Sequence, residues 1–170
     1  TSVAHLEKAT GLGRQSLYNT FGGKRALFQA SLNHYEETRA TGFSACLAGA
    51  EDPMAAIQQV VGSWANAARA NSCRGCLLLN TASEFGGREP DMVATVTRVL
   101  QAQQQALATT LTRAQAAGQL AADANPVALA RRLQATLHGL TLMSRLNPDD
   151  EVLDDVVADT LASLCRMSAA

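Results

Sequence analysis

The sequence predicts an all-α fold, and three observations support that prediction. Apolar residues recur at spacings of three and four along most of the chain, which is the spacing of one helix face. Strand-like alternation of apolar and polar residues is absent, and Gly, Asp-Pro or Asn-Pro steps separate the apolar stretches. With 170 residues, 47% of them hydrophobic, the chain is long and apolar enough to bury a sizeable core.

Two short helices with a sharp turn between them are predicted at the N-terminus. The first covers residues 2–10, and Gly11 ends it because glycine adopts the left-handed conformation at little cost. The second covers residues 14–20 and directs Leu17 toward the core. A long third helix begins at Lys24. This order is typical of a helix-turn-helix, which reads DNA through its second helix.

The outer surface of the second predicted helix carries side chains that folding does not need. Arg and Gln form paired hydrogen bonds to the edges of guanine and adenine, whereas hydroxyl groups and Lys suit phosphates. The exposed set is Arg14, Gln15, Ser16, Tyr18, Asn19 and Thr20. Arg14 stands at the start of the helix, where a guanidinium group has the reach and geometry to bind guanine.

The rest of the chain is predicted to form helices with clear starts and ends. Asp and Asn cap helices, and Pro is favoured in the first turn. Helices are predicted over residues 24–47, from Asp52-Pro53 to Asn71-Ser72, over residues 74–85, from Glu89-Pro90 to Gly118, from Asn125-Pro126 to Asn147-Pro148, and from Asp149 to Leu164. With the two N-terminal helices, the total is eight.

An ordered set of residues spans the whole N-terminal turn and consists of Thr1-Ser2-Val3, Leu6, Ala9-Thr10-Gly11-Leu12, Ser16-Leu17-Tyr18, Phe21, Lys24 and Leu27. It closely resembles the signature of the TetR family of bacterial transcription regulators. Residues 75–81, 117–120 and 125–130 are more faintly similar to the AcrR-type branch of that family. The resemblance implies a helix-turn-helix DNA-binding domain at residues 1–28 and a ligand-binding and dimerisation domain at residues 29–170. Because family members carry another helix ahead of the motif, we expect the DNA-binding domain to be N-terminally incomplete.

The resemblance also implies individual roles on double-stranded operator DNA. It puts Arg14, Gln15 and Asn19 at base-reading positions, and Thr1, Ser16, Tyr18, Thr20 and Lys24 near the phosphates. The distribution of charge agrees. Residues 1–28 hold four basic residues against one acidic residue, a balance of +3, whereas the net charge of the whole chain is -1 and that of the remainder is therefore -4. The basic end attracts DNA.

A homodimer is expected, because family members pair their last two helices with those of a second subunit. The candidate interface residues are Leu133, Leu137, Leu140, Val157, Leu161 and Leu164. Two reading helices in a dimer fit successive major grooves and require a near-palindromic operator. The simpler alternative is that these leucines and valine form only the core within one chain.

A small apolar or aromatic molecule is the expected ligand of the C-terminal region, which is rich in Leu, Val, Ala and Met. Bulky candidates for the walls of a pocket are Trp64, Phe85 and Met143, and polar candidates are Asn80, Glu84, Gln103, Gln104, Gln134 and His138. Each polar side chain is more often on the surface or bonded within the core. His138 is the strongest candidate, because it lies among apolar residues on a helix that faces inward.

The pair Cys73 and Cys76 allows a different function, the sensing of oxidants or electrophiles. A thiol at a helix N-terminus beside an Arg tends toward the reactive thiolate, although Cys is also a common small core residue. Zinc would need two further ligands, and the remaining Cys and His residues are scattered.

Several other functions lack their sequence signals. The chain has no Gly-rich phosphate loop, no Gly-x-Ser-x-Gly elbow and no paired Glu-x-x-His motifs, so we expect neither an enzyme nor a cofactor or metal site. It has no apolar run long enough to cross a membrane and no signal-peptide pattern, so a cytoplasmic location is expected. A helical small-molecule-binding module without DNA activity remains an alternative.

Overall fold

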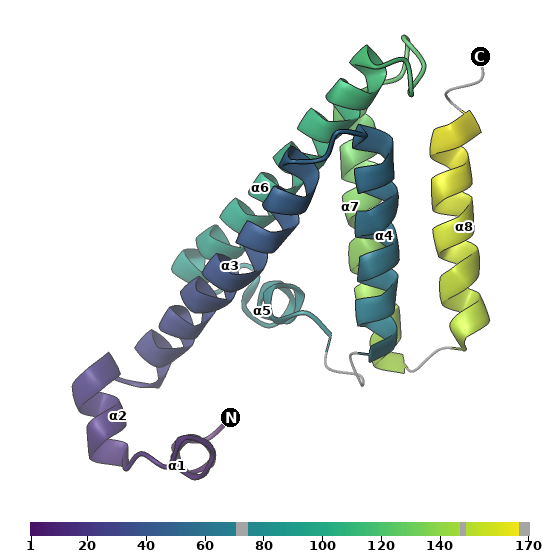
Figure 1. Cartoon of the computed structure of the whole chain (residues 1–170). Coiled ribbons are helices and arrows are strands. Elements are labelled where there is room, and N and C mark those ends of the chain that lie inside the picture. The colour runs from purple at the N-terminus through teal and green to yellow at the C-terminus, as the bar shows by residue number, and fades with distance from the viewer. Residues whose placement is uncertain (71–74, 147–148, 167–170) are drawn as a thin grey trace. The chain divides into compact units, whose positions relative to one another are not determined.

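The computed structural model describes residues 1–70, 75–146 and 149–166. Every regular element in these ranges is a helix: there are eight α-helices and one short 3-10 helix, η1. Figure 1 shows the α-helices along the chain. The all-α prediction is confirmed. None of these helices is long and apolar enough to cross a membrane.

The chain divides into two compact units, Thr1–Thr38 and Arg39–Ala170. The division falls inside the long helix α3 (Lys24–Ala48), whereas the sequence analysis placed the domain boundary at residue 28. The reason is that α3 begins within the first unit and continues into the second without a break.

The N-terminal unit contains α1 (Val3–Thr10), α2 (Arg14–Phe21) and the first part of α3. Ser2 caps α1, since its hydroxyl group accepts a hydrogen bond of 3.2 Å from the backbone N–H of His5. Gly22, with a φ of 79°, ends α2 and donates its N–H to the carbonyl of Tyr18 at 2.8 Å. The predicted order of two short helices and a long third is confirmed.

The C-terminal unit is a helical bundle around one core. It contains the end of α3 together with α4 (Pro53–Ala70), α5 (Leu77–Phe85), α6 (Pro90–Ala116), α7 (Pro126–Met143), η1 (Ser144–Leu146) and α8 (Asp150–Arg166). Helix α6 packs against α4, α5 and α7, and α4 also contacts α7 and α8 (Figure 1). Fully buried leucine and isoleucine side chains from α3, α4, α6, α7 and α8 fill the core, among them Leu47, Ile57, Leu107, Leu133 and Leu164.

Prolines and caps set most of the helix starts as predicted. The Asp52 carboxylate accepts hydrogen bonds from the backbone N–H groups of Met54 and Ala55 and from the Gln119 amide, and these bonds, that of Ala55 first, hold the pKa of Asp52 below its usual range. Asn125 caps α7 by accepting from the N–H of Ala128 at 3.0 Å. Pro53, Pro90 and Pro126 all stand in first turns.

One predicted start is wrong. The sequence predicts a helix that starts at Arg74, but α5 begins at Leu77, because Gly75 has a φ of 69° and Cys76 is extended. Arg74 lies outside the described residues, as do the predicted ends at Asn71-Ser72 and Asn147-Pro148.

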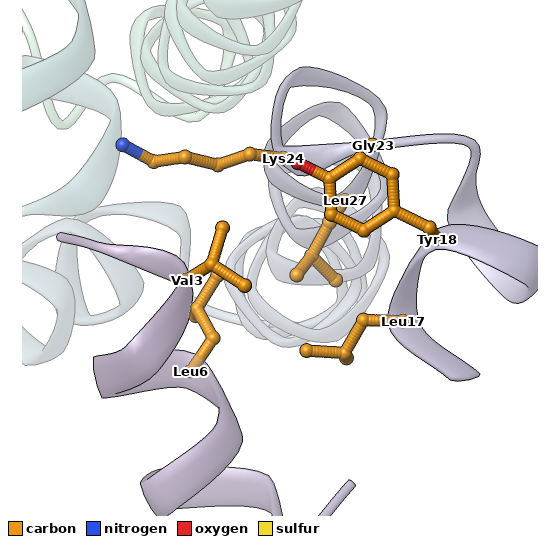
Figure 2. Close-up of a pocket in the computed structure, with 7 residues that line it drawn as sticks. All are labelled: Val3, Leu6, Leu17, Tyr18, Gly23, Lys24 and Leu27. Carbon is orange, nitrogen blue, oxygen red and sulfur yellow. The ribbon is translucent and has the colours of Figure 1, made fainter. Parts of the chain in front are cut away.

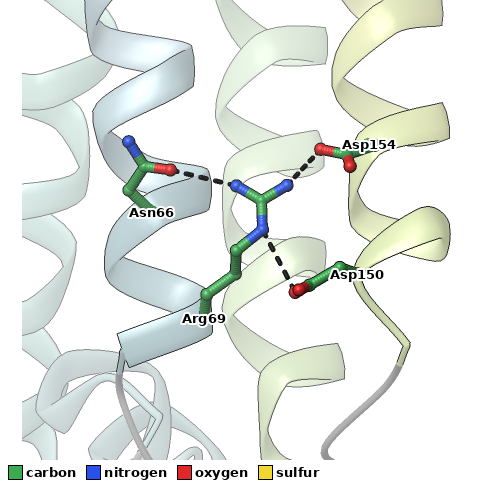
Figure 3. Close-up of polar contacts among 4 residues, drawn as sticks. All are labelled: Asn66, Arg69, Asp150 and Asp154. Atoms are coloured by element: carbon green, nitrogen blue, oxygen red, sulfur yellow. Dashed lines mark hydrogen bonds and ion pairs between the residues drawn. The ribbon is translucent and has the colours of Figure 1, made fainter.

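Two arginines tie helices of the C-terminal unit together. Figure 3 shows Arg69 of α4 between Asp150 and Asp154 of α8, with an Nε to Oδ1 distance of 3.3 Å to Asp150, and Nη1 also donates to Asn66 at 3.0 Å. Arg113 of α6 donates to the carbonyls of Leu47, Ala48 and Ala50, the first two at 3.1 and 3.3 Å. The C-terminal end of α3 is therefore fastened to α6.

Candidate functional site

The turn between α1 and α2 is held by a carboxylate. Gly11, with a φ of 70°, ends α1. The Glu7 side chain then accepts a hydrogen bond of 2.7 Å from the backbone N–H of Arg14, the first residue of α2. Gly13 occupies the N-cap position and has no side chain that could do this. Glu7 therefore caps α2 from the neighbouring helix. This role was not predicted from the sequence, where its signal is no more than an acidic residue shortly before the turn.

Helix α2 presents its predicted reading residues to solvent. Leu17 is only 5% exposed and anchors the helix, whereas all eight predicted DNA-binding residues are exposed: Thr1, Arg14, Gln15, Ser16, Tyr18, Asn19, Thr20 and Lys24. Two contacts order this surface. The Gln15 amide donates to Asn19 Oδ1 at 3.0 Å, and the Arg14 guanidinium carbon lies 5.5 Å from the centre of the Tyr18 ring. Their roles on DNA stay predictions.

An apolar hollow lies where α1, α2 and α3 meet (Figure 2). Its lining consists of Val3, Leu6, Leu17, Tyr18, Gly23, Lys24 and Leu27. The Tyr18 ring packs beside Gly23 and lies 4.0 Å, an ordinary contact distance, from the point where a Cβ on Gly23 would stand. Tyr18 and Lys24 thus bury part of their apolar surface while their polar ends stay accessible.

The positive charge of this unit is confined to its first two helices and the start of α3. Residues 1–28 have a balance of +3, but Glu36 and Glu37 lie later in the same unit, which therefore has a net charge of only +1. The attraction for DNA is localised at the helix-turn-helix rather than spread over the whole unit.

Several predicted ligand residues of the C-terminal unit gather around one tryptophan. Trp64 of α4 donates its indole N–H to Thr141 Oγ1 of α7 at 2.8 Å, and its ring centre lies 6.1 Å from that of His138. Phe43 of α3 meets the indole edge to face, with ring centres 5.8 Å apart. Gln134 lies one turn before His138 on α7 and donates to the carbonyl of Leu100 on α6 at 2.7 Å. The sequence analysis named Trp64, Gln134 and His138 but not the roles of Phe43 and Thr141.

The sequence of the C-terminal unit decides the family. Residues 53–159 match a family described as "Tetracyclin repressor-like, C-terminal domain", and this match covers more than half of the chain. The chain belongs to the TetR family. It is a DNA-binding transcriptional regulator rather than an enzyme, in agreement with the expectation from its N-terminal motif.

Two curated relatives align over nearly the whole chain. The HTH-type transcriptional regulator YezE of Bacillus subtilis (strain 168) is 30% identical over 166 residues, which are 96% of this chain and 86% of YezE. The HTH-type transcriptional repressor ComR of Escherichia coli (strain K12) is 26% identical over 163 residues, or 95% of this chain and 78% of ComR.

Solved TetR-family structures share the fold. The regulatory protein TetR from Rhodobacter sphaeroides is 26% identical, with a TM-score of 0.81 over 98% of this chain and 87% of that one. A cysteine mutant of the TetR-family regulator CifR, complexed with 26-bp double-strand operator DNA, is 24% identical, with a TM-score of 0.81 over 96% of this chain and 86% of that one.

The other predicted ligand residues of this TetR-family chain have varied surroundings. Asn80 Oδ1 accepts a hydrogen bond of 2.7 Å from Arg145, and Glu84 is exposed. Phe85, Gln103, Gln104 and Met143 are half-buried. The tryptophan cluster is therefore the best-defined part of the predicted ligand site, and binding at each of these residues stays a prediction.

Four of the predicted dimer-interface residues are buried within the chain itself. Leu133, Leu137, Leu140 and Leu164 are each at most 2% exposed, and three of them belong to the core of the chain itself. Val157 and Leu161 are half-buried against that core. The prediction of this seam is wrong for the four leucines, because the apolar stripes of α7 and α8 face α4, α6 and each other within one chain.

The predicted thiol pair is only partly described. Cys73 lies outside the described residues. Cys76 occupies the N-cap position of α5 and is half-buried. The predicted helix from Arg74 would have placed both cysteines around its first turn, but the later start leaves Cys76 just ahead of α5.

Proposed function

We propose that this chain is a homodimeric TetR-type repressor that binds a near-palindromic operator and is released by a small apolar or aromatic molecule. The observation that carries the proposal is the exposed surface of α2, where Arg14, Gln15 and Asn19 stand clear of the core. The name of ComR, a repressor, and the operator complex of CifR support the same reading. Such a regulator acts in the cytoplasm, where bacterial DNA is.

Direct base reading by α2 follows from its chemistry. A guanidinium group bonds both acceptors of guanine, and an amide bonds adenine in the same paired way. The hydroxyl groups of Ser16, Tyr18 and Thr20 and the ammonium of Lys24 supply phosphate contacts, which position the helix without specifying sequence. Thr1 adds a further phosphate contact from the start of α1.

The dimer would use the outward face of α7 in place of the buried leucines. Ala128, Ala135 and Leu142 are exposed and lie seven residues apart, so they form one stripe along the helix, and Leu142 is 64% exposed. Small residues in such a stripe allow two helices to approach closely. Arg131 of α7 and Asp155 of α8 are both exposed and carry opposite charges, which a two-fold axis would bring together between subunits.

Release by a ligand would be a shift between two conformations. A molecule that binds one conformation better than the other shifts the population toward it. The contact of Phe43 with Trp64 joins α3 to the predicted ligand residues, and α3 continues into the DNA-reading unit. A ligand that moves this contact would pivot α3, change the separation of the two reading helices and lower operator affinity.

The test is a selection of bound sequences from random duplex DNA with the full-length protein. We expect enrichment of a near-palindrome whose half-sites lie about one helical turn, roughly 34–36 Å, apart. The Arg14→Ala variant should lose preference at one base pair of each half-site, while Arg88→Ala, a change at an exposed arginine of the C-terminal unit, should keep it. Failure to enrich any sequence at low salt would overturn the proposal.

A further inference from the structure

The half-buried imidazole of His138 forms no hydrogen bond with the described part of the chain. Its one ring contact is the tilted approach to Trp64. Burial is what lowers the pKa of His138, and no charged side chain contributes to that change. At pH 7 the ring is therefore neutral, with one nitrogen as a donor and the other as an acceptor.

Both nitrogens of His138 remain reachable. Among the described residues, no buried side-chain nitrogen or oxygen lacks a hydrogen-bond partner. Because the imidazole has no such partner, its nitrogens are not completely enclosed, and each keeps some accessible surface. Gln134, one turn away, also has an acceptor to offer. Its amide nitrogen donates to the Leu100 carbonyl, and its amide oxygen can accept a further hydrogen bond.

The aromatic wall beside these groups is fixed in place. Trp64 uses its only donor on Thr141, whose hydroxyl group in turn donates to the Leu137 carbonyl at 3.0 Å. The Phe43 ring packs edge to face against the indole. The half-buried indole therefore has no donor left for a ligand and can supply only apolar contacts, while His138 and Gln134 can supply hydrogen bonds.

We propose that this cluster binds a small, uncharged aromatic molecule that carries one hydroxyl group, with the ring against Trp64 and the hydroxyl group bonded to His138, beside Gln134. A hydroxyl group both donates and accepts, as these two side chains require. A carboxylate or an ammonium would need an opposite charge to offset its desolvation, and none of the side chains of the cluster is charged. The inference rests on the proposed ligand release and names the chemistry of the ligand.

The test uses three probes of similar shape: phenol, toluene and benzoate. Phenol stays neutral at pH 7, toluene replaces its hydroxyl group by a methyl group, and benzoate is an anion. Trp64 is the only tryptophan of the chain, so its indole N–H gives a single, assigned signal in an ¹H–¹⁵N spectrum. We expect phenol to shift this signal saturably, toluene to bind about 3- to 10-fold more weakly for the loss of one hydrogen bond, and benzoate to leave it unmoved.

Two variants locate the hydrogen bond. His138→Phe keeps an aromatic ring but removes both nitrogens, and it should bind phenol and toluene equally. His34→Phe makes the same change at an exposed position of α3 and should keep the preference for phenol. The proposal is overturned if no probe moves the indole signal, if benzoate binds as well as phenol, or if His138→Phe retains the preference.

Operator binding is measured separately, by fluorescence anisotropy with and without phenol. A protein that selects an operator but does not bind phenol would keep its proposed function and lose only this ligand assignment. A protein that binds phenol at Trp64 but selects no operator would keep the ligand site and lose the proposed function.

Discussion

Replacement of Arg113 by methionine should markedly destabilise the C-terminal unit. The guanidinium group of Arg113 reaches from α6 to three carbonyl oxygens at and just beyond the end of α3, those of Leu47, Ala48 and Ala50. The last carbonyls of a helix have no partner within it, so these bonds satisfy groups that would otherwise need water. Methionine retains much of the unbranched apolar stem and removes all three donors, so the change tests the bonds rather than the packing.

The expected loss in the free energy of unfolding depends on which of these hydrogen bonds water can replace. The bond to Ala48 is the longest, at 3.3 Å, and is exposed, whereas those to Leu47 and Ala50 are partly buried. A hydrogen bond to a charged group contributes about 1.5–3 kcal/mol. Two partly buried bonds at the low end of that range give a loss of roughly 3 kcal/mol. With a slope of about 2–3 kcal/mol per molar urea, the unfolding midpoint should fall by about 1–1.5 M.

Urea unfolding, followed by far-UV circular dichroism at one fixed protein concentration, measures this change. Arg88→Met is the matched control, because Arg88 is exposed and should tolerate the change within about 0.5 kcal/mol. If Arg113→Met were no more destabilising than Arg88→Met, the hydrogen bonds from Arg113 to the carbonyls at the end of α3 would contribute no stability, which contradicts the prediction.

Three further outcomes are expected. Arg14→Ala should weaken specific operator binding by about 1–3 kcal/mol in fluorescence anisotropy and leave non-specific binding at low salt largely intact; equal loss on all sequences would mean a phosphate role instead. Leu142→Asp should shift the protein toward monomer in analytical ultracentrifugation, and an unchanged dimer would exclude the stripe on α7. Because burial lowers the pKa of His138 below its ordinary 6.5, the unfolded state binds this proton more readily, so the free energy of unfolding should decrease as the pH falls below about 6.5. The decrease should be smaller in His138→Gln, and the same pH dependence in both proteins would contradict the assigned cause.

Features set by local sequence could be predicted well. Pro53, Pro90 and Pro126 mark helix starts because proline fits the first turn and no later one. Gly11 and Gly22 mark helix ends because their left-handed backbone disfavours other residues. The exposure of the reading residues also followed from one short helix, in which Leu17 alone is buried.

Features that depend on contacts across the chain could not be predicted. Helices α7 and α8 are apolar on more than one face, so periodicity alone does not say which face meets the core of the same chain and which meets a partner. The buried leucines were assigned to the dimer interface for that reason. The hydrogen bond between Trp64 and Thr141 joins residues 77 positions apart, and no local sequence pattern predicts such a pairing.

The carboxylate of Glu7 has a consequence for how α2 approaches DNA. The N-terminus of a helix is ordinarily a site for anions, because its backbone N–H groups and its dipole favour negative charge. In this protein that position is already occupied by a fixed negative charge, 2.7 Å from the N–H of Arg14. A phosphate placed there would be repelled, so α2 gains little from the DNA backbone through its own end. Bases, which carry no charge, meet no such barrier, so the base contacts proposed for Arg14, Gln15 and Asn19 would not be opposed by the Glu7 carboxylate.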